Sequence, residues 1–157
     1  MKRTIETRKV LEAYNVLGTA KYGQLDEKEK VAVWKIAMAM MGIATRYNEV
    51  MNAARKTFKP CDDFEEKVDK IQQYETMIRQ KDCELSKLPM GAAEYADLIA
   101  NMVKPYNRLV GKAMEEESEK KVTLEFEPVS EDTFSRLMAS NEWTMGQAAA
   151  LGHIIMK

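Results

Sequence analysis

The most regular pattern of apolar positions in this chain lies between residues 26 and 58. Apolar side chains recur there at alternating steps of four and three residues, which is typical of one face of an α-helix. These positions are Val33, Ala37, Met40, Ala44, Tyr47, Met51, Ala54 and Phe58. Asp26 stands where a helix cap is favoured, and Glu27 and Glu29 place negative charge near the positive end of the helix dipole. Pro60 ends the pattern, so the sequence predicts one long helix here.

A second helix is predicted from about residue 62 to residue 88. Its apolar stripe comprises Phe64, Val68, Ile71, Tyr74, Ile78 and Leu85, and Pro89 ends it. Only residues 59–61 separate it from the first helix, and so short a link favours an antiparallel pair. The sequence therefore predicts a long antiparallel helical hairpin over residues 26–88, within a small helical bundle.

Two further segments have helical spacing. The first predicts a helix from Thr4, as its cap, to about Gly18. The second runs from Ala92 to Ala113, but Pro105 falls inside it. Proline lacks the backbone N–H and clashes with the preceding turn, so we expect a kink or two separate helices at this point.

The period of the pattern changes at residues 122–127, where apolar and polar side chains alternate as in a half-buried strand. Residues 22–25 are the other extended candidate, so we expect a two-stranded antiparallel ribbon between these segments, with pairing between molecules as the alternative. Ser130 and Thr144 are predicted to cap the helices of a tail over residues 130–157. The expected fold is mainly α with a minor two-stranded β element, in a single domain over residues 1–157.

Charge and hydropathy narrow the function classes. Lys and Arg together number 24 against 25 Asp and Glu, a balance that disfavours a nucleic-acid-binding protein with its basic face. A nucleic-acid-associated accessory protein stays open as an alternative, with its basic side drawn from Lys2, Arg3, Arg8, Lys9, Arg46, Arg55, Lys56 and Lys59. No apolar run approaches the roughly 18–20 residues of a membrane span, and no apolar leader follows Met1. We therefore expect no membrane association and a cytoplasmic location.

Few residues in the chain suit metal or nucleophilic chemistry. His153 is the one histidine, and the two cysteines, Cys61 and Cys83, have no companion ligand at metal-site spacing. The Glu-x-x-His pattern of helical di-metal sites is absent, because Ala150 stands three residues before His153. We expect no metal, no cofactor, no small-molecule substrate and no enzymatic activity. A helical enzyme that uses Tyr, Glu and Lys without His is the alternative.

Methionine is the unusual component of the composition, with 12 in 157 residues. Its flexible side chain adapts to irregular surfaces, although most of these methionines have the spacing of core residues. Trp34, Met38 and Met41 form a second row on the first long helix. Together with Tyr74 and Met77 of the next helix, they are the candidate interaction surface. We therefore expect a protein partner or self-association.

The order of these elements resembles that of uncharacterised small proteins of phages and prophages. The resemblance is carried by Thr4-Ile5-Glu6 with Val10, Leu11 and Leu17, by residues 26–56 with Tyr47 and Ala53-Ala54-Arg55-Lys56, and by residues 122–126 before a helical tail. It covers most of the chain, although the stretch over residues 61–88 is longer than that pattern requires. The resemblance implies a mobile-element protein that acts by association rather than by catalysis, and it transfers no enzymatic residue.

Overall fold

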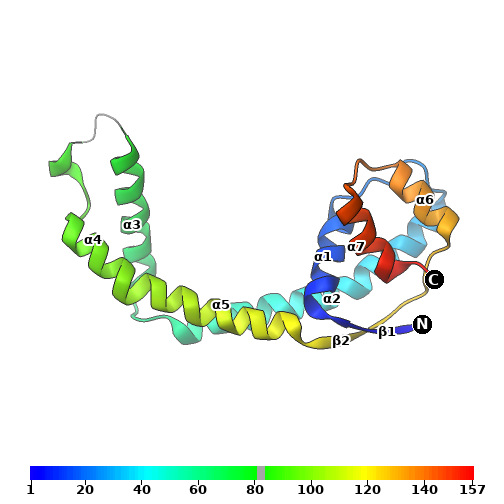
Figure 1. Ribbon diagram of the computed structural model, residues 1–157, viewed down its shortest axis with the longest axis horizontal. Coiled ribbons are helices and arrows are strands. Elements are labelled where there is room, and N and C mark those ends of the chain that lie inside the picture. The colour runs from blue at the N-terminus through cyan, green and yellow to red at the C-terminus, as the bar shows by residue number, and fades with distance from the viewer. Residues whose placement is uncertain (81–83) are drawn as a thin grey trace. The chain divides into compact units, whose positions relative to one another are not determined.

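The computed structural model describes residues 1–80 and 84–157 and confirms a mainly α-helical fold with a small two-stranded antiparallel sheet (Figure 1). Its contacts gather in two compact units. We call Met1–Val50 with Glu115–Lys157 the sheet unit, and Met51–Met114 the helical unit. Helices α2 (Glu27–Phe58) and α5 (Lys104–Glu119) contribute residues to both units. No change of composition marks the boundaries, and the expectation of a single domain stays a prediction.

The sheet joins the N-terminal residues to a segment more than a hundred positions later. Strand β1 (Lys2–Glu6) pairs with β2 (Lys121–Glu125) in antiparallel register, with Thr4 opposite Thr123. The predicted strand over residues 122–127 is thus present, shifted by one or two residues, but its predicted partner is wrong. Residues 22–25 form a turn, in which the N–H of Leu25 donates to the carbonyl of Tyr22 at 3.0 Å.

The helix predicted from Thr4 begins later, because residues 2–6 are used by the sheet. Helix α1 covers Thr7–Gly18. The Thr7 N–H and hydroxyl both donate to the carbonyl of Lys120, at 2.9 and 2.8 Å, so the sheet extends to the first residue of the helix. Side chains alternate between the two faces of β1. Arg3 and Ile5 lie on the inner face of the sheet, whereas Lys2 and Thr4 are exposed.

The core of the sheet unit collects side chains from α1, α2, β2, α6 (Glu131–Ala139) and α7 (Met145–Ile155). Fully buried members include Val10, Ile36, Met40, Leu124, Leu137, Leu151 and Ile155. The predicted caps are confirmed: the Ser130 hydroxyl accepts from the N–H of Thr133 at 3.2 Å, and Thr144 forms a capping box with Gln147. The sequence therefore places these helix starts correctly from local chemistry.

Arg3 connects β1 to the end of α7. Its guanidinium donates to the carbonyls of His153 and Ile154, at 2.7 and 2.6 Å, and to that of Met156. The last carbonyls of a helix have no partner within the helix, and a cation there also complements the negative end of the dipole. This contact therefore caps α7 from the opposite end of the sequence.

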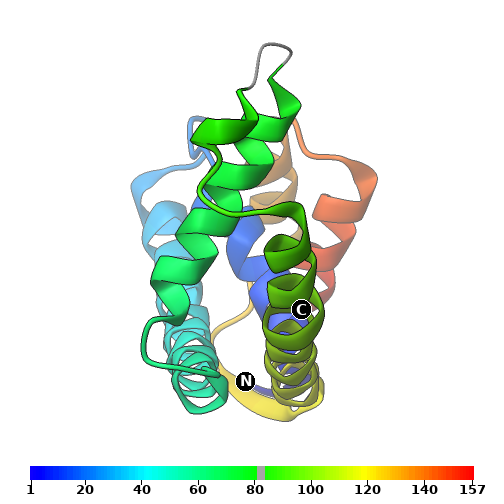
Figure 2. The ribbon, with the colours of Figure 1, turned by 90° about the vertical axis from the view of Figure 1, so that its left-hand side faces the viewer.

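The helical unit is built around α3 (Phe64–Arg79) and α4 (Ala92–Leu98), which lie side by side (Figures 1 and 2). The rings of Tyr74 and Tyr95 stack with centroids 4.4 Å apart, and the Tyr95 hydroxyl donates to Glu75 at 2.7 Å. The hairpin prediction expected α3 to pack along the preceding helix. Its buried face instead packs on Met90, Leu88, Tyr95, Leu98, Ile99 and Val103.

Helix α3 is shorter than its apolar stripe predicts. It ends at Arg79, where Gln80 adopts extended backbone angles, and Leu85–Lys87 form a short 3-10 turn, η1. Leu85, the last residue of the predicted stripe, is 77% exposed and has no core to face. Cys83 lies outside the described residues.

The interruption expected at Pro105 is present. A π-helical segment, η2 (Ile99–Val103), follows α4 and ends just before α5, in which Pro105 is the second residue. Proline cannot donate the hydrogen bond that the preceding turn would accept, and a widened turn accommodates its ring. The chain therefore passes from α4 to α5 through this π-helical segment.

Candidate functional site

The first half of α2 has two apolar faces. Val33, Ile36 and Met40 point into the core of the sheet unit and are fully buried. A second set lies at the spacing of the opposite face and stays exposed: Val31 (50%), Trp34 (58%), Met38 (40%) and Met41 (38%). We call these four residues the outer face of α2. So large a group of exposed apolar side chains on one helix marks a candidate interaction surface.

Cationic side chains flank the outer face. Lys28 and Lys35 line a hollow of about 590 Å³ beside Val31, together with Ile36, Phe126 and two carboxylates, Glu125 and Glu127. On the other side of the helix, Lys30 pairs with Glu27 at 2.8 Å. Lys28 and Lys35 form no ion pair with any residue that the structure describes. Charges of both signs therefore flank the outer face, and Lys28 and Lys35 are the lysines among them without an ion pair in the described residues.

The structure separates the five residues of the candidate interaction surface. Trp34, Met38 and Met41 lie together on the outer face of α2, whereas Tyr74 and Met77 belong to α3 in the helical unit. Tyr74 is only 8% exposed and stacks on Tyr95, so it is a core residue. Met77 is half-buried. The sequence analysis missed Val31, although its place three residues before Trp34 on the same helix indicates the same face.

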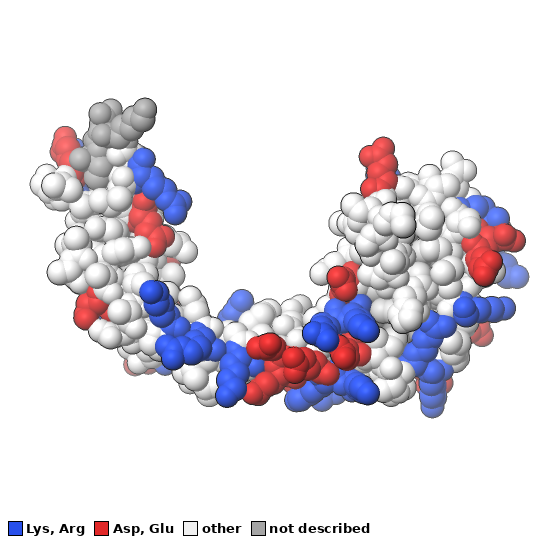
Figure 3. Space-filling view, in the orientation of Figure 1, with Lys and Arg blue, Asp and Glu red and all other residues white. Residues whose placement is uncertain are grey.

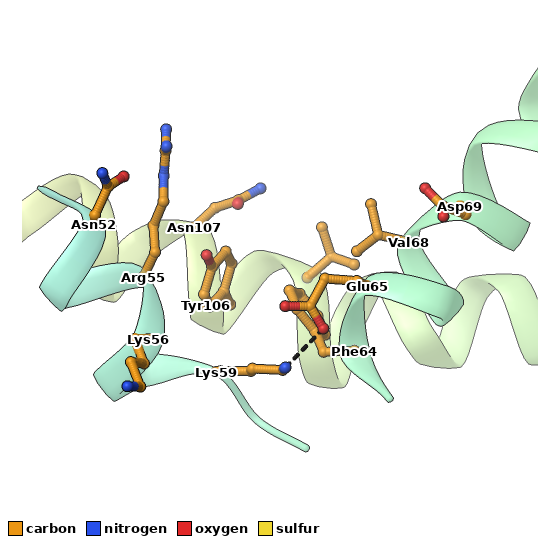
Figure 4. A pocket seen from close by; sticks show the side chains of 11 residues that line it. Asn52, Arg55, Lys56, Lys59, Phe64, Glu65, Val68, Asp69, Tyr106 and Asn107 are labelled. Atoms are coloured by element: carbon orange, nitrogen blue, oxygen red, sulfur yellow. Dashed lines mark ion pairs between the residues drawn. The ribbon is translucent and has the colours of Figure 1, made fainter. Parts of the chain in front are cut away.

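A second candidate site is a hollow of about 610 Å³ in the helical unit, between the end of α2, the start of α3 and the region around Pro105 (Figure 4). Its floor is formed by the rings of Phe64 and Tyr106, which meet with centroids 4.7 Å apart at an angle of 54°. Its polar rim comprises Asn52, Arg55, Lys56, Lys59, Glu65, Asp69 and Asn107. The hollow thus combines an aromatic floor with charges of both signs.

An ion pair in this hollow, between Lys59 and Glu65, stabilises the charged form of both side chains. The Lys59 ammonium lies 2.7 Å from the Glu65 carboxylate. This pairing raises the pKa of Lys59 and lowers the pKa of Glu65. A lysine that acts as a base or nucleophile needs the opposite, a lowered pKa. The Lys59–Glu65 pair therefore suits recognition of charge better than proton transfer.

Cys61, in the link between α2 and α3, is likewise held in its protonated form. Its hydrogen bond to Asp63, together with partial burial, raises the pKa of the Cys61 thiol, and the same hydrogen bond lowers the pKa of Asp63. Lys67 acts against this shift. Because the thiolate is the reactive form of cysteine, this environment makes Cys61 a poor nucleophile.

The strongest ion pair of the sheet unit joins α2 to α6. Arg136 donates to the carboxylate of Glu29, which also accepts from the hydroxyl of Thr133 at 3.0 Å. The Glu29 carboxylate further accepts the N–H of Asp26 at 3.0 Å. These hydrogen bonds to the charged form, the one from Arg136 above all, lower the pKa of Glu29 to about 2. Glu29 therefore caps α2 and holds α6 at the same time.

The basic residues singled out in the sequence do not act as one group. Arg55, Lys56 and Lys59 meet at the hollow of the helical unit, whereas Arg3 is used to cap α7. On the face shown in Figure 3, Lys and Arg side chains alternate with Asp and Glu side chains. Within the described ranges, no three His, Cys, Asp or Glu side chains are placed to hold a metal ion. Among the same residues, no helix combines the length and the apolar character needed to cross a membrane.

The geometry thus gives two candidate surfaces, the outer face of α2 and the hollow of the helical unit. Known proteins add no further constraint on them. No family model, curated protein or solved structure matches the chain.

Proposed function

We propose that this chain is a non-enzymatic interaction protein of a phage or another mobile element, which binds a helix of a partner protein on the outer face of α2. The observation that carries this proposal is the exposure of Val31, Trp34, Met38 and Met41 opposite the buried face of the same helix. The connection to a mobile element comes from the sequence resemblance alone.

The chemistry of the outer face suits a helical partner. Tryptophan and methionine are enriched at the centres of protein interfaces, and methionine adapts to the shape of a docked helix. Covering the exposed part of each such side chain contributes roughly 1 kcal/mol. An amphipathic helix presents its own apolar side chains at matching spacing.

Charge complementarity defines the flanks of the partner. Lys28 and Lys35 lie on one side of the outer face and Lys30 on the other. A partner helix with acidic side chains beside its apolar stripe pairs with these lysines, whereas one with basic flanks is repelled. The partner that we propose is therefore an amphipathic helix whose acidic side chains lie on the side of Lys28 and Lys35, which form no ion pair within the described residues.

Tryptophan fluorescence tests this proposal directly. In a Trp143→Phe background, Trp34 is the one remaining tryptophan. Titration with a designed amphipathic peptide with Glu flanks is expected to shift its emission to shorter wavelength. The same peptide with Lys flanks should leave the emission unchanged at equal concentration. Equal shifts with both peptides, or no shift with either, would contradict the proposal.

A pair of Met→Glu variants supplies the matched control. Met38→Glu places a charge on the outer face and should weaken peptide binding at least tenfold. Met145→Glu replaces a methionine that is 90% exposed at the start of α7, where a negative charge is favourable, and should bind as the parent does. Equal affinities for the two variants would place the peptide elsewhere on the molecule.

The hollow of the helical unit supports a second candidate function, which is association with nucleic acid. It is favoured by the cationic side chains of Arg55 and Lys56 beside an aromatic floor, to which Asn52 and Asn107 add hydrogen-bonding groups. Phosphate contacts make such binding strongly dependent on salt. A gel shift with single-stranded DNA at low salt that is lost in Arg55→Ala/Lys56→Ala would support it, and no shift at low salt would exclude it.

A further inference from the structure

Strand β1 leaves one edge of the sheet without a backbone partner. Met1 and Phe126 exchange hydrogen bonds in both directions, at 2.9 and 3.0 Å, and the N–H of Thr7 donates to Lys120 at 2.9 Å. In an antiparallel ladder, alternate residues face the partner strand. The backbone N–H groups of Lys2, Thr4 and Glu6 therefore point away from β2. The carbonyls of Lys2 and Thr4 point away from β2 as well. Within the residues that the structure describes, none of these groups has a hydrogen-bond partner.

The surface beside β1 is hollowed. It has a volume of about 700 Å³ and is lined by residues 3–6 on one side. It is also lined by Lys9 of α1, by Lys121 of β2, and by Gly152, His153, Met156 and Lys157 at the end of α7 and just after it. The edge of β2 is different, because residues of α2 line the hollows beside it, from Lys28 near Glu125 to Tyr47 near Thr123. Residues of α2 thus lie beside β2 over most of its length, whereas among the described helices the hollow beside β1 meets only Lys9 of α1 and the end of α7.

The outward side chains of β1 are complementary to themselves. Along the solvent face they read Lys2, Thr4 and Glu6. Strand β2 has the same order of side chains, Lys121, Thr123 and Glu125. Within one chain, the antiparallel register therefore places opposite charges across from each other. The Lys2 ammonium lies 3.7 Å from the Glu125 carboxylate, and Glu6 lies opposite Lys121. A second copy of β1, antiparallel and centred on Thr4, repeats this arrangement with Lys2 opposite Glu6 and Thr4 opposite Thr4. Opposite charges across neighbouring strands are favourable, whereas a parallel copy in register places Lys2 opposite Lys2.

We propose that two copies of this chain associate through β1, antiparallel about Thr4, and form one sheet with the strand order β2–β1–β1–β2. The two Thr4 residues exchange N–H and carbonyl hydrogen bonds across a two-fold axis, and the N–H of Glu6 donates to the carbonyl of Lys2 of the other copy. The Glu6 carboxylate also pairs with Arg8 of its own chain at 2.6 Å, beside the edge. This contact goes beyond the proposed function, since it uses neither the outer face of α2 nor a partner protein.

Proline variants test the contact on a folded protein. Thr4→Pro removes an N–H that points away from β2, so the β1–β2 ladder keeps its hydrogen bonds. Thr123→Pro is the matched control, since it removes the outward N–H of β2 in the same register. In sedimentation velocity over a concentration series, we expect the parent and Thr123→Pro to dimerise and Thr4→Pro to stay monomeric. A parent that is monomeric throughout, or equal dimerisation of the two variants, would overturn the proposal.

Charge variants provide a second test that does not depend on proline. In its own dimer, Lys2→Glu sets a carboxylate opposite the carboxylate of Glu6, and Glu6→Lys sets an ammonium opposite the ammonium of Lys2. Each variant alone should therefore dimerise at least tenfold more weakly than the parent.

 In a mixture of the two variants, both cross-strand pairs of the mixed dimer join a carboxylate to an ammonium group, so the mixture restores opposite charges and should form a heterodimer. Failure of the mixture to associate better than its components would contradict the Thr4-centred register.

The same measurement separates this proposal from the proposed function. Met38→Glu on the outer face of α2 should dimerise as the parent does. If Met38→Glu abolishes the dimer and Thr4→Pro leaves it intact, then the self-contact lies on α2, and the pairing through β1 is wrong. Loss of peptide binding without loss of the dimer affects the proposed function alone.

Discussion

The two units of this protein are stabilised in different ways. The core of the sheet unit joins segments from the first and the last residues of the chain, and many of its side chains are fully buried. The buried cluster of the helical unit consists of Ile71, Tyr74 and Met90, which are close in sequence and surrounded by half-buried neighbours. Stability is not uniform within a molecule, and regions with few buried apolar contacts open first. We therefore expect the helical unit to open first.

The largest expected effect comes from truncating a core side chain in each unit. Ile155→Ala empties a fully buried position of the sheet unit and should cost about 2–5 kcal/mol of unfolding free energy. Trp34 and Trp143 both lie in the sheet unit, so their fluorescence during urea unfolding reports this unit, while far-UV circular dichroism reports both. Ile71→Ala should instead shift the circular-dichroism transition and leave the fluorescence midpoint close to that of the parent. Equal fluorescence shifts for the two variants would show that the units unfold together.

An intermediate effect is expected from two glycines that differ in their surroundings. A Cβ atom at Gly152 of α7 would lie 2.9 Å from Cζ of Phe134, so α7 approaches α6 too closely for any side chain. Gly152→Ala should therefore cost roughly 1–3 kcal/mol. Gly111 of α5 has no atom within 4 Å of such a Cβ, and Gly111→Ala should stabilise its helix by up to about 1 kcal/mol. Thermal unfolding of both variants checks the comparison, and a Gly152→Ala variant as stable as the parent would contradict it.

The smallest effect concerns the dependence of stability on pH. The pKa of Glu29 is about 2 in the folded protein against an ordinary value of 4.5, because Arg136 donates to its charged form. Its stabilising contribution is therefore complete above pH 4.5 and is lost as the pH falls from 4.5 towards 2. In Glu29→Gln, the urea midpoint detected by tryptophan fluorescence should decrease less between pH 4.5 and pH 2 than it does in the parent. Glu65→Gln removes a carboxylate of lowered pKa from the helical unit. It should leave the pH dependence of the fluorescence-detected midpoint the same as in the parent.

The elements that local chemistry specifies are those that the sequence analysis predicts best. The spacing over residues 26–58 and the caps at Asp26, Ser130 and Thr144 each depend on neighbours within a turn or two, and all are present. The partner of β2 is different, since pairing with residues 2–6 depends on contacts across more than a hundred positions. Nothing local distinguishes these residues from the start of a helix, so the predicted partner is wrong.

The candidate surface shows the same limit on the scale of single side chains. Helical spacing shows that Trp34 and Met38 share a face, but it does not show whether another segment covers that face. The apolar residues Met40 and Tyr74 obey the same spacing and are buried. Exposure depends on the tertiary arrangement, and it is exposure that separates Trp34 from Tyr74 as interaction residues.

The pairing of β1 with β2 also has a consequence for biosynthesis. Ribosomes add roughly 5–20 residues per second, so β1 emerges several seconds before residues 121–125 exist. During this interval α1 and the first half of α2 have no sheet and no α7 to cover them, while residues 51–114 can already assemble their own cluster. The less stable unit is thus the one that can fold first on the ribosome, and the apolar residues of α1 and of the first half of α2 are exposed to chaperones until α7 has been synthesised.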